Sequence, residues 1–183
     1  YGTDLNVYYA FIEVIRPNGG TWRFGRSDTP YSRFLGYAGP TINDGFYSYR
    51  EVGEISYAFT GSNGFNFVAA LVDDEDGNFI PDAELGINFA RGWGSIGAIC
   101  ADADAAGGFG MGAKASLVIN FPNTNGSFFK LMAMFNTNPA SAYGFGDGVG
   151  NLSVLAGLNL AFTPKVSMGL TGQFIFGSGF FAA

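Results

Sequence analysis

Apolar and polar residues alternate over segments of about ten residues, and this alternation constrains the fold more than any other feature of the chain. From 111 to 121 the odd positions are Met, Ala, Ala, Leu, Ile and Phe, whereas the even positions are Gly, Lys, Ser, Val and Asn. The same two-residue period runs through residues 152–162 and 166–176. Because successive side chains of a β-strand point to opposite faces, each segment is predicted to be a strand with one apolar and one more polar face.

Strand length distinguishes two classes of β protein. Strands of soluble domains average about five or six residues, whereas a tilted strand that crosses a bilayer needs about nine to eleven. The pattern predicts about ten strands, most of them of the longer kind, near residues 4–15, 20–27, 50–60, 64–73, 83–91, 93–102, 109–121, 127–136, 150–163 and 165–177. Length and alternation together favour an all-β fold, a transmembrane antiparallel β-barrel.

The connections between the predicted strands alternate in length. Short turns rich in Gly, Asn, Ser and Pro lie around residues 18–20, 61–64, 92, 122–126 and 163–165. Longer connections lie near residues 28–49, 74–82, 103–108 and 137–149. Outer-membrane barrels have tight periplasmic turns at one end and long extracellular loops at the other, so this alternation supports the same fold class.

Composition excludes several other classes of protein. Of the 183 residues, 48% are hydrophobic and only 13% are charged, yet no apolar run approaches the length of a transmembrane helix, which is about 20 residues. The sequence has no histidine, which removes Ser-His-Asp, Cys-His and His-metal sites. We therefore expect no enzyme and no cofactor. The net charge of −6 argues against a nucleic-acid partner, since such proteins need a basic face.

Several runs of the sequence resemble a known family. FGRSD at 24–28, SRFLGYAG at 32–39, INDG at 42–45 and GEISYAFTGSNGF at 53–65 are similar to the general diffusion porins of alphaproteobacteria, of the Brucella and rhizobial type, and GWGSI at 92–96 extends the match. The resemblance implies an outer-membrane barrel of about sixteen antiparallel strands, normally a homotrimer, in contact with lipid and lipopolysaccharide. It also implies passage of small polar solutes and ions.

The resemblance implies that residues 1–183 form one domain that is part of a longer barrel. Ten predicted strands are fewer than the family's, and an incomplete barrel would expose unpaired strand edges to lipid, where each unsatisfied backbone group costs several kcal/mol. We therefore expect the first and last strands to lie outside this chain. In the family, one extracellular loop folds into the lumen and narrows the pore, and that loop corresponds here to residues 27–49.

The length of this segment alone indicates a functional loop, since a simple hairpin connection is much shorter. The candidate constriction residues are Asp28, Tyr31, Arg33 and Asp44 in this connection and Arg23, Arg26 and Arg50 beside it. Acidic groups on one side of a pore and arginines on the other would create a transverse field that orients polar solutes. The competing interpretation is that these charges solvate a loop or pair with one another.

Polar side chains within the strands are expected to line water. The candidate lumen residues are Lys114, Lys130, Glu54, Glu84 and Gln173. A cation that faced lipid at the middle of the bilayer would cost about 2 to 4 kcal/mol, so the polar faces of the strands should point into the lumen.

No metal site is expected. The acidic run at 73–78 crowds oxygen ligands, but counting from Asp74 leaves Phe79 and Leu85 where an EF-hand loop needs Gly and Glu. A solvated extracellular loop is the simpler interpretation, and a loop bridged to lipopolysaccharide through divalent ions is the alternative. The sequence therefore predicts an outer-membrane porin for passive diffusion of small hydrophilic solutes. The alternative is a non-conducting outer-membrane barrel with an adhesion or structural role.

Overall fold

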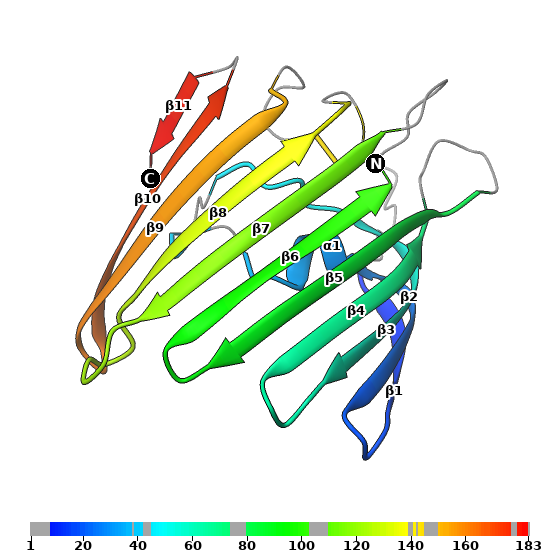
Figure 1. Ribbon diagram of the computed structural model, residues 1–183, viewed down its shortest axis with the longest axis horizontal. Helices are drawn as coiled ribbons and strands as arrows, with labels where there is room; N and C mark the ends of the chain where they lie inside the picture. The colour runs from blue at the N-terminus through cyan, green and yellow to red at the C-terminus, as the bar shows by residue number, and fades with distance from the viewer. Residues whose placement is uncertain are drawn as a thin grey trace, which may run out of the picture.

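The computed structural model describes residues 8–37, 39–41, 45–73, 80–102, 110–138, 141, 143–144, 150–176 and 179–182. They form one antiparallel sheet of eleven strands arranged in chain order (Figure 1). The strands are β1 (Ala10–Ile15), β2 (Gly20–Asp28), β3 (Glu51–Thr60), β4 (Phe65–Val72), β5 (Asp82–Arg91), β6 (Gly94–Asp102), β7 (Met111–Asn120), β8 (Phe128–Asn136), β9 (Leu152–Thr163), β10 (Val166–Phe176) and β11 (Gly179–Ala182). A one-turn helix, α1 (Pro30–Arg33), lies between β2 and β3.

The predicted strands are confirmed, and one strand was missed. β1 begins at Ala10, and residues 4–7 of the predicted first strand lie outside the described part of the chain. β11 was not predicted because four residues are too few to establish a two-residue period. It pairs with β10 from Gly172 opposite Ala182 to Ile175 opposite Gly179.

The sheet has two different ends. The β1–β2, β3–β4, β5–β6, β7–β8 and β9–β10 turns lie at the lower end of Figure 1, and the longer connections lie at the other. Gly94 shows how tightly these hairpins are built. Its φ is +138°, and a Cβ there would lie 1.9 Å from the carbonyl oxygen of Val118 on β7, so only glycine allows β6 to start directly after its turn.

The two faces of the sheet differ in the way the alternation predicts. One face, called here the outward face, exposes large apolar side chains such as Leu85, Ile87 and Leu170, at 63%, 57% and 53%. The opposite face carries polar side chains that are almost fully buried, including Glu84 and Gln173. The connection of residues 29–50, called here the β2–β3 segment, covers this polar face and is seen behind the sheet in Figure 1.

The described sheet is open at both edges. β1 pairs only with β2, and β11 pairs only with β10, among the residues that the structure describes. No α-helix in the same part of the chain is long and apolar enough to cross a bilayer.

Candidate functional site

The β2–β3 segment is closed at its base by hydrogen bonds between its two ends. The backbone N–H of Thr29 donates to the carbonyl oxygen of Arg50 at 3.0 Å. The hydroxyl of Ser32 accepts from the Arg50 N–H at 2.7 Å and donates to the Arg50 carbonyl at 3.1 Å. Pro30 begins α1, a position where its fixed φ suits the helix and its missing N–H costs nothing.

A buried carboxylate anchors the beginning of α1 to the sheet. Glu84 of β5 accepts a hydrogen bond from the Tyr31 N–H at 2.7 Å and another from the Tyr143 hydroxyl at 3.1 Å. Lys114 of β7 donates through Nζ to the Tyr31 carbonyl at 2.8 Å and lies 4.0 Å from the centre of the Tyr31 ring. Hydrogen bonds that involve a charged group are about twice as strong as neutral ones, so these contacts fix the helix firmly.

The tyrosines of this anchor are themselves buried. The rings of Tyr31 and Tyr143 pack edge to face, with centroids 4.9 Å apart. Burial, followed by the nearby charge of Glu84, raises the pKa of both hydroxyls well above the ordinary tyrosine value. Both phenols therefore stay protonated at physiological pH.

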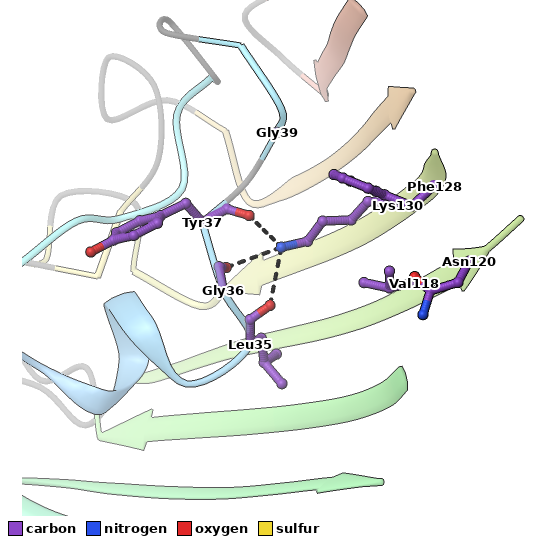
Figure 2. Close-up of a pocket in the computed structure, with 8 residues that line it drawn as sticks. All are labelled: Leu35, Gly36, Tyr37, Gly39, Val118, Asn120, Phe128 and Lys130. Atoms are coloured by element: carbon purple, nitrogen blue, oxygen red, sulfur yellow. Dashed lines mark hydrogen bonds between the residues drawn. The ribbon is translucent and has the colours of Figure 1, made fainter. Parts of the chain in front are cut away.

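A second lysine anchors the chain just after α1. Figure 2 shows Nζ of Lys130 directed at three successive backbone carbonyls of the β2–β3 segment. It donates to the oxygens of Leu35 and Gly36 at 3.0 and 3.1 Å, and to that of Tyr37. The three bonds use all three donors of the ammonium group.

A pocket of about 340 Å³ lies beside this lysine (Figure 2). It is lined by the β2–β3 segment and by residues of β7 and β8, namely Leu35, Gly36, Tyr37, Gly39, Val118, Asn120, Phe128 and Lys130. It therefore lies between the segment and the wall of the sheet.

Apolar and polar contacts continue the docking across β8, β9 and β10. Met132, Met134, Leu155 and Ile175 form a buried cluster against which Leu35 and Tyr47 of the segment pack. Gln173 of β10 accepts from the Phe46 N–H at 2.7 Å and donates to its carbonyl at 2.6 Å. Apolar residues occur on this otherwise polar face because the segment covers them.

Three tyrosine hydroxyls meet the carboxylate of Asp28 at the end of β2. Tyr9 and Tyr37 donate to it at 2.7 and 3.0 Å, and Tyr49 also donates to it. The hydrogen bond to Asp28 raises the pKa of Tyr37, and burial followed by the same carboxylate raises that of Tyr49. The carboxylate thus joins both arms of the segment.

Arginine and glutamate side chains form a network between the segment and β1 to β3. Arg33 of α1 lies 3.0 Å from Glu54, and Arg23 lies 3.7 Å from Glu54 and 2.6 Å from Glu13. Burial lowers the pKa of Arg33, and the charge of Glu54 opposes that shift. At the other arm of the segment, Arg50 forms an ion pair with Asp82 at 2.8 Å.

The structure pairs the predicted constriction arginines with carboxylates of the strands, among them Glu54 and Asp82. Among the described residues, these ion pairs do not divide into acids of the segment and arginines of the wall. Arg33 belongs to the segment and Glu54 to the wall, and Arg23 pairs with the same glutamate. Buried charges are stable only when they are paired, which is the competing interpretation given above. Asp44 lies outside the described residues.

Arg26 lies on a different face from the one predicted. It is two residues from Phe24 on β2 and therefore shares the outward face. Its side chain is 46% exposed, and its Nε lies 3.8 Å from Glu51. Its placement in the pore wall was wrong because the prediction considered its proximity in sequence to the segment and not the alternation of the strand.

The expectation that the strand lysines line water is also wrong in one respect. Lys114 and Lys130 lie on the polar face as predicted, but they are 3% and 5% exposed because the segment covers them. Glu54, Glu84 and Gln173 are buried there too. The acceptors of the two lysines are backbone carbonyls, which no side-chain pattern reveals.

Two residues of this site carry no signal in the sequence. Tyr143, which donates to Glu84, and Asp82, which pairs with Arg50, were assigned only to long connections. The acidic run at 73–78 lies mostly outside the described residues. The part of the chain that the structure describes has no cluster of three potential metal ligands.

Comparison with known proteins defines the class to which this sheet and its docked segment belong. Residues 2–179 match the family model of the porin subfamily, and the chain belongs to this family. It is therefore a β-barrel protein of the bacterial outer membrane, and the family is one of channels, not enzymes.

Porins named Omp2b are among the relatives found. Those of Brucella abortus, Brucella suis and Brucella canis are 36% identical to the chain over 121 residues, which is 55% of this chain and 32% of each relative. The match thus spans about a third of the length of these relatives. No solved structure matches the chain.

Proposed function

We propose that this chain forms part of the wall and the constriction of a water-filled channel for passive diffusion of small hydrophilic solutes and ions. The observation that carries the proposal is the β2–β3 segment, which docks on the polar face of a sheet whose other face is apolar. A segment held inside a barrel in this way narrows the bore, and bore and charge set the filter of a porin.

The assembly and surroundings of the channel belong to the same proposal. Family membership supports a homotrimer, and the exposed apolar face supports contact with outer-membrane lipid and lipopolysaccharide. An apolar outer band is the general architecture of outer-membrane barrels.

The constriction is proposed to consist of the β2–β3 segment and the charges beside it. Arg33 and Arg23 contribute positive charges paired with Glu54, and Asp28 contributes a carboxylate that tyrosine hydroxyls hydrogen-bond. Asp44 is proposed as a further acid of the constriction. Lys114, Lys130 and Glu84 are proposed to hold the segment against the wall and so to set the diameter of the pore.

One observation favours a second candidate, a non-conducting barrel with an adhesion or structural role. Met132, Met134 and Leu155 fill part of the polar face with apolar bulk, and the buried arginines form ion pairs within the chain. A lumen packed in this way over its whole cross-section would pass no ions.

Single-channel conductance of the full-length protein in a planar lipid bilayer tests the two candidates. Stable openings that arrive in groups of three support a trimeric diffusion channel. A correctly folded barrel without conductance would leave the adhesion or structural role as the better proposal.

Ion selectivity tests the constriction itself. The double variant Asp28→Asn with Asp44→Asn is expected to lower cation preference, measured as the reversal potential in a salt gradient. A matched control is Asp102→Asn at the end of β6, away from the segment. An unchanged reversal potential in the double variant would contradict a role for these acids in the filter.

A further inference from the structure

The short-turn end of the sheet has an unusual charge composition. The turns at 16–20, 61–64, 91–94, 121–127 and 163–166 contain three basic residues, Arg16, Arg91 and Lys165, and no Asp or Glu. All three are exposed, and none forms an ion pair within the described part of the chain. We call these residues the basic rim.

The opposite end of the sheet is acidic. The strand ends that face the long connections carry the acidic residues Asp28, Glu51, Asp73, Asp82 and Asp102. Arg50 at this end is neutralised by Asp82. Among the described hairpins, the unpaired positive charge is therefore concentrated at the short-turn end of the sheet.

Aromatic side chains of the outward face accompany the basic rim. Arg91 lies 5.5 Å from the ring centre of Phe89, and Trp93 beside it is 45% exposed. Phe162, three residues before Lys165, is 60% exposed. Aromatic residues of this kind mark the level of lipid head groups in membrane proteins.

Arg16 of the basic rim lines a groove. A groove of about 450 Å³ lies at the β1–β2 hairpin and is lined by Val14, Arg16, Trp22 and Phe24. Its walls are apolar and aromatic, and its charged group is a single guanidinium near the turn. An acyl chain fits the apolar walls, and a phosphate fits the guanidinium, which can bind its oxygens in a bidentate manner.

We propose that the basic rim binds the phosphate groups of anionic phospholipids in the leaflet at the short-turn end of the barrel. Each cation serves a separate lipid, because the three hairpins are four strands apart, roughly 20 Å at the usual strand spacing. The proposal rests on the proposed membrane barrel and adds a specific lipid to its surroundings. A cation near an anionic lipid surface favours association roughly fivefold.

The test uses full-length protein reconstituted in phosphatidylcholine bilayers with spin-labelled lipids. The relative association of labelled phosphatidylglycerol over phosphatidylcholine is measured by electron spin resonance. The wild-type protein is expected to prefer phosphatidylglycerol, with a preference that falls as salt is raised. The triple variant Arg16→Gln, Arg91→Gln, Lys165→Gln is expected to lose the preference.

Arg26→Gln is the matched control, because Arg26 is also an exposed arginine of the outward face but lies at the acidic end. It is expected to leave the lipid preference unchanged, whereas Arg91→Gln alone should lower it. A wild-type protein without any preference at low salt, or a triple variant that keeps it, overturns the proposal. A protein that conducts ions but shows no preference overturns this proposal alone, and one that does not insert into bilayers overturns both.

Discussion

The two faces of the sheet differ in which side chains they expose. On the outward face, Ile87 and Leu170 are more than half exposed, whereas on the covered face Glu84 and Gln173 have no exposed surface. A soluble protein would reverse this arrangement, because burial of apolar surface drives its folding. The difference indicates that the outward face contacts lipid. The polar face, in contrast, binds the β2–β3 segment of the same chain.

A charge placed on the outward face should show the largest effect. Ile87→Arg, at the middle of β5, is expected to destabilise the folded protein by about 2 to 4 kcal/mol, because the charge lies in the hydrocarbon core. Val166→Arg is the control, since Val166 is exposed to the same extent, 57%, but adjoins a short turn. Its cost should be about 0 to 1 kcal/mol.

These costs are measured by denaturant-dependent folding of the full-length protein into phospholipid bilayers. Equal costs at the two positions would contradict the assignment of the outward face to the interior of the bilayer.

On the covered face, the loss of an anchor should release the segment. Lys130→Met removes the ammonium group from three carbonyl oxygens and should weaken docking by about 2 to 3 kcal/mol. Larger single-channel conductance and faster proteolysis between residues 29 and 50 are the expected results. Lys165→Met, at an exposed turn, is the control and should leave both unchanged. Unaltered conductance of Lys130→Met would show that the segment is held mainly by other contacts.

The faces of the sheet could be predicted from the sequence, but the contacts between them could not. Alternation assigned Lys114, Lys130 and Glu84 to the polar face because the two-residue period is a local property of a strand. Their backbone partners belong to residues 31 and 35–37, which lie some 50 to 100 positions away in sequence. Only the fold of the segment brings these groups together, and no side-chain pattern encodes a carbonyl acceptor.

The error at Arg26 has a different cause. Proximity in sequence to the segment suggested a role in the constriction, although the same alternation that succeeded elsewhere places Arg26 with Phe24. The two-residue period therefore predicts the face on which Arg26 lies better than its charge does.

The two buried tyrosines of the covered face provide a smaller, matched comparison. Tyr143→Phe loses a hydrogen bond to the Glu84 carboxylate and should destabilise the docked segment by about 1.5 kcal/mol. Tyr31→Phe should cost less than about 0.5 kcal/mol, because the Tyr31 hydroxyl is buried without a hydrogen-bond partner in the described structure. Thermal unfolding of both variants checks the difference. A larger loss for Tyr31→Phe would mean that its hydroxyl has a partner, such as a buried water.

Moderately alkaline pH should have the smallest effect of all. The pKa values of Tyr31, Tyr49 and Tyr143 are raised, in each case first by burial. A group with a raised folded-state pKa stabilises the fold fully below its unfolded pKa, about 10 for tyrosine, and loses this contribution as pH rises through the folded value. Conductance should therefore stay constant from pH 7 to 9 and increase only above about pH 10.

Absorbance at 295 nm separates this release of the segment from general unfolding. Exposed tyrosines should ionise first, and the buried group should ionise together with the rise in conductance. Tyr31→Phe should remove one late-titrating phenol and leave the early phase unchanged. A single titration phase near pH 10 for every tyrosine would contradict burial. Only a phenol shielded from water by the docked segment resists ionisation beyond its ordinary pKa.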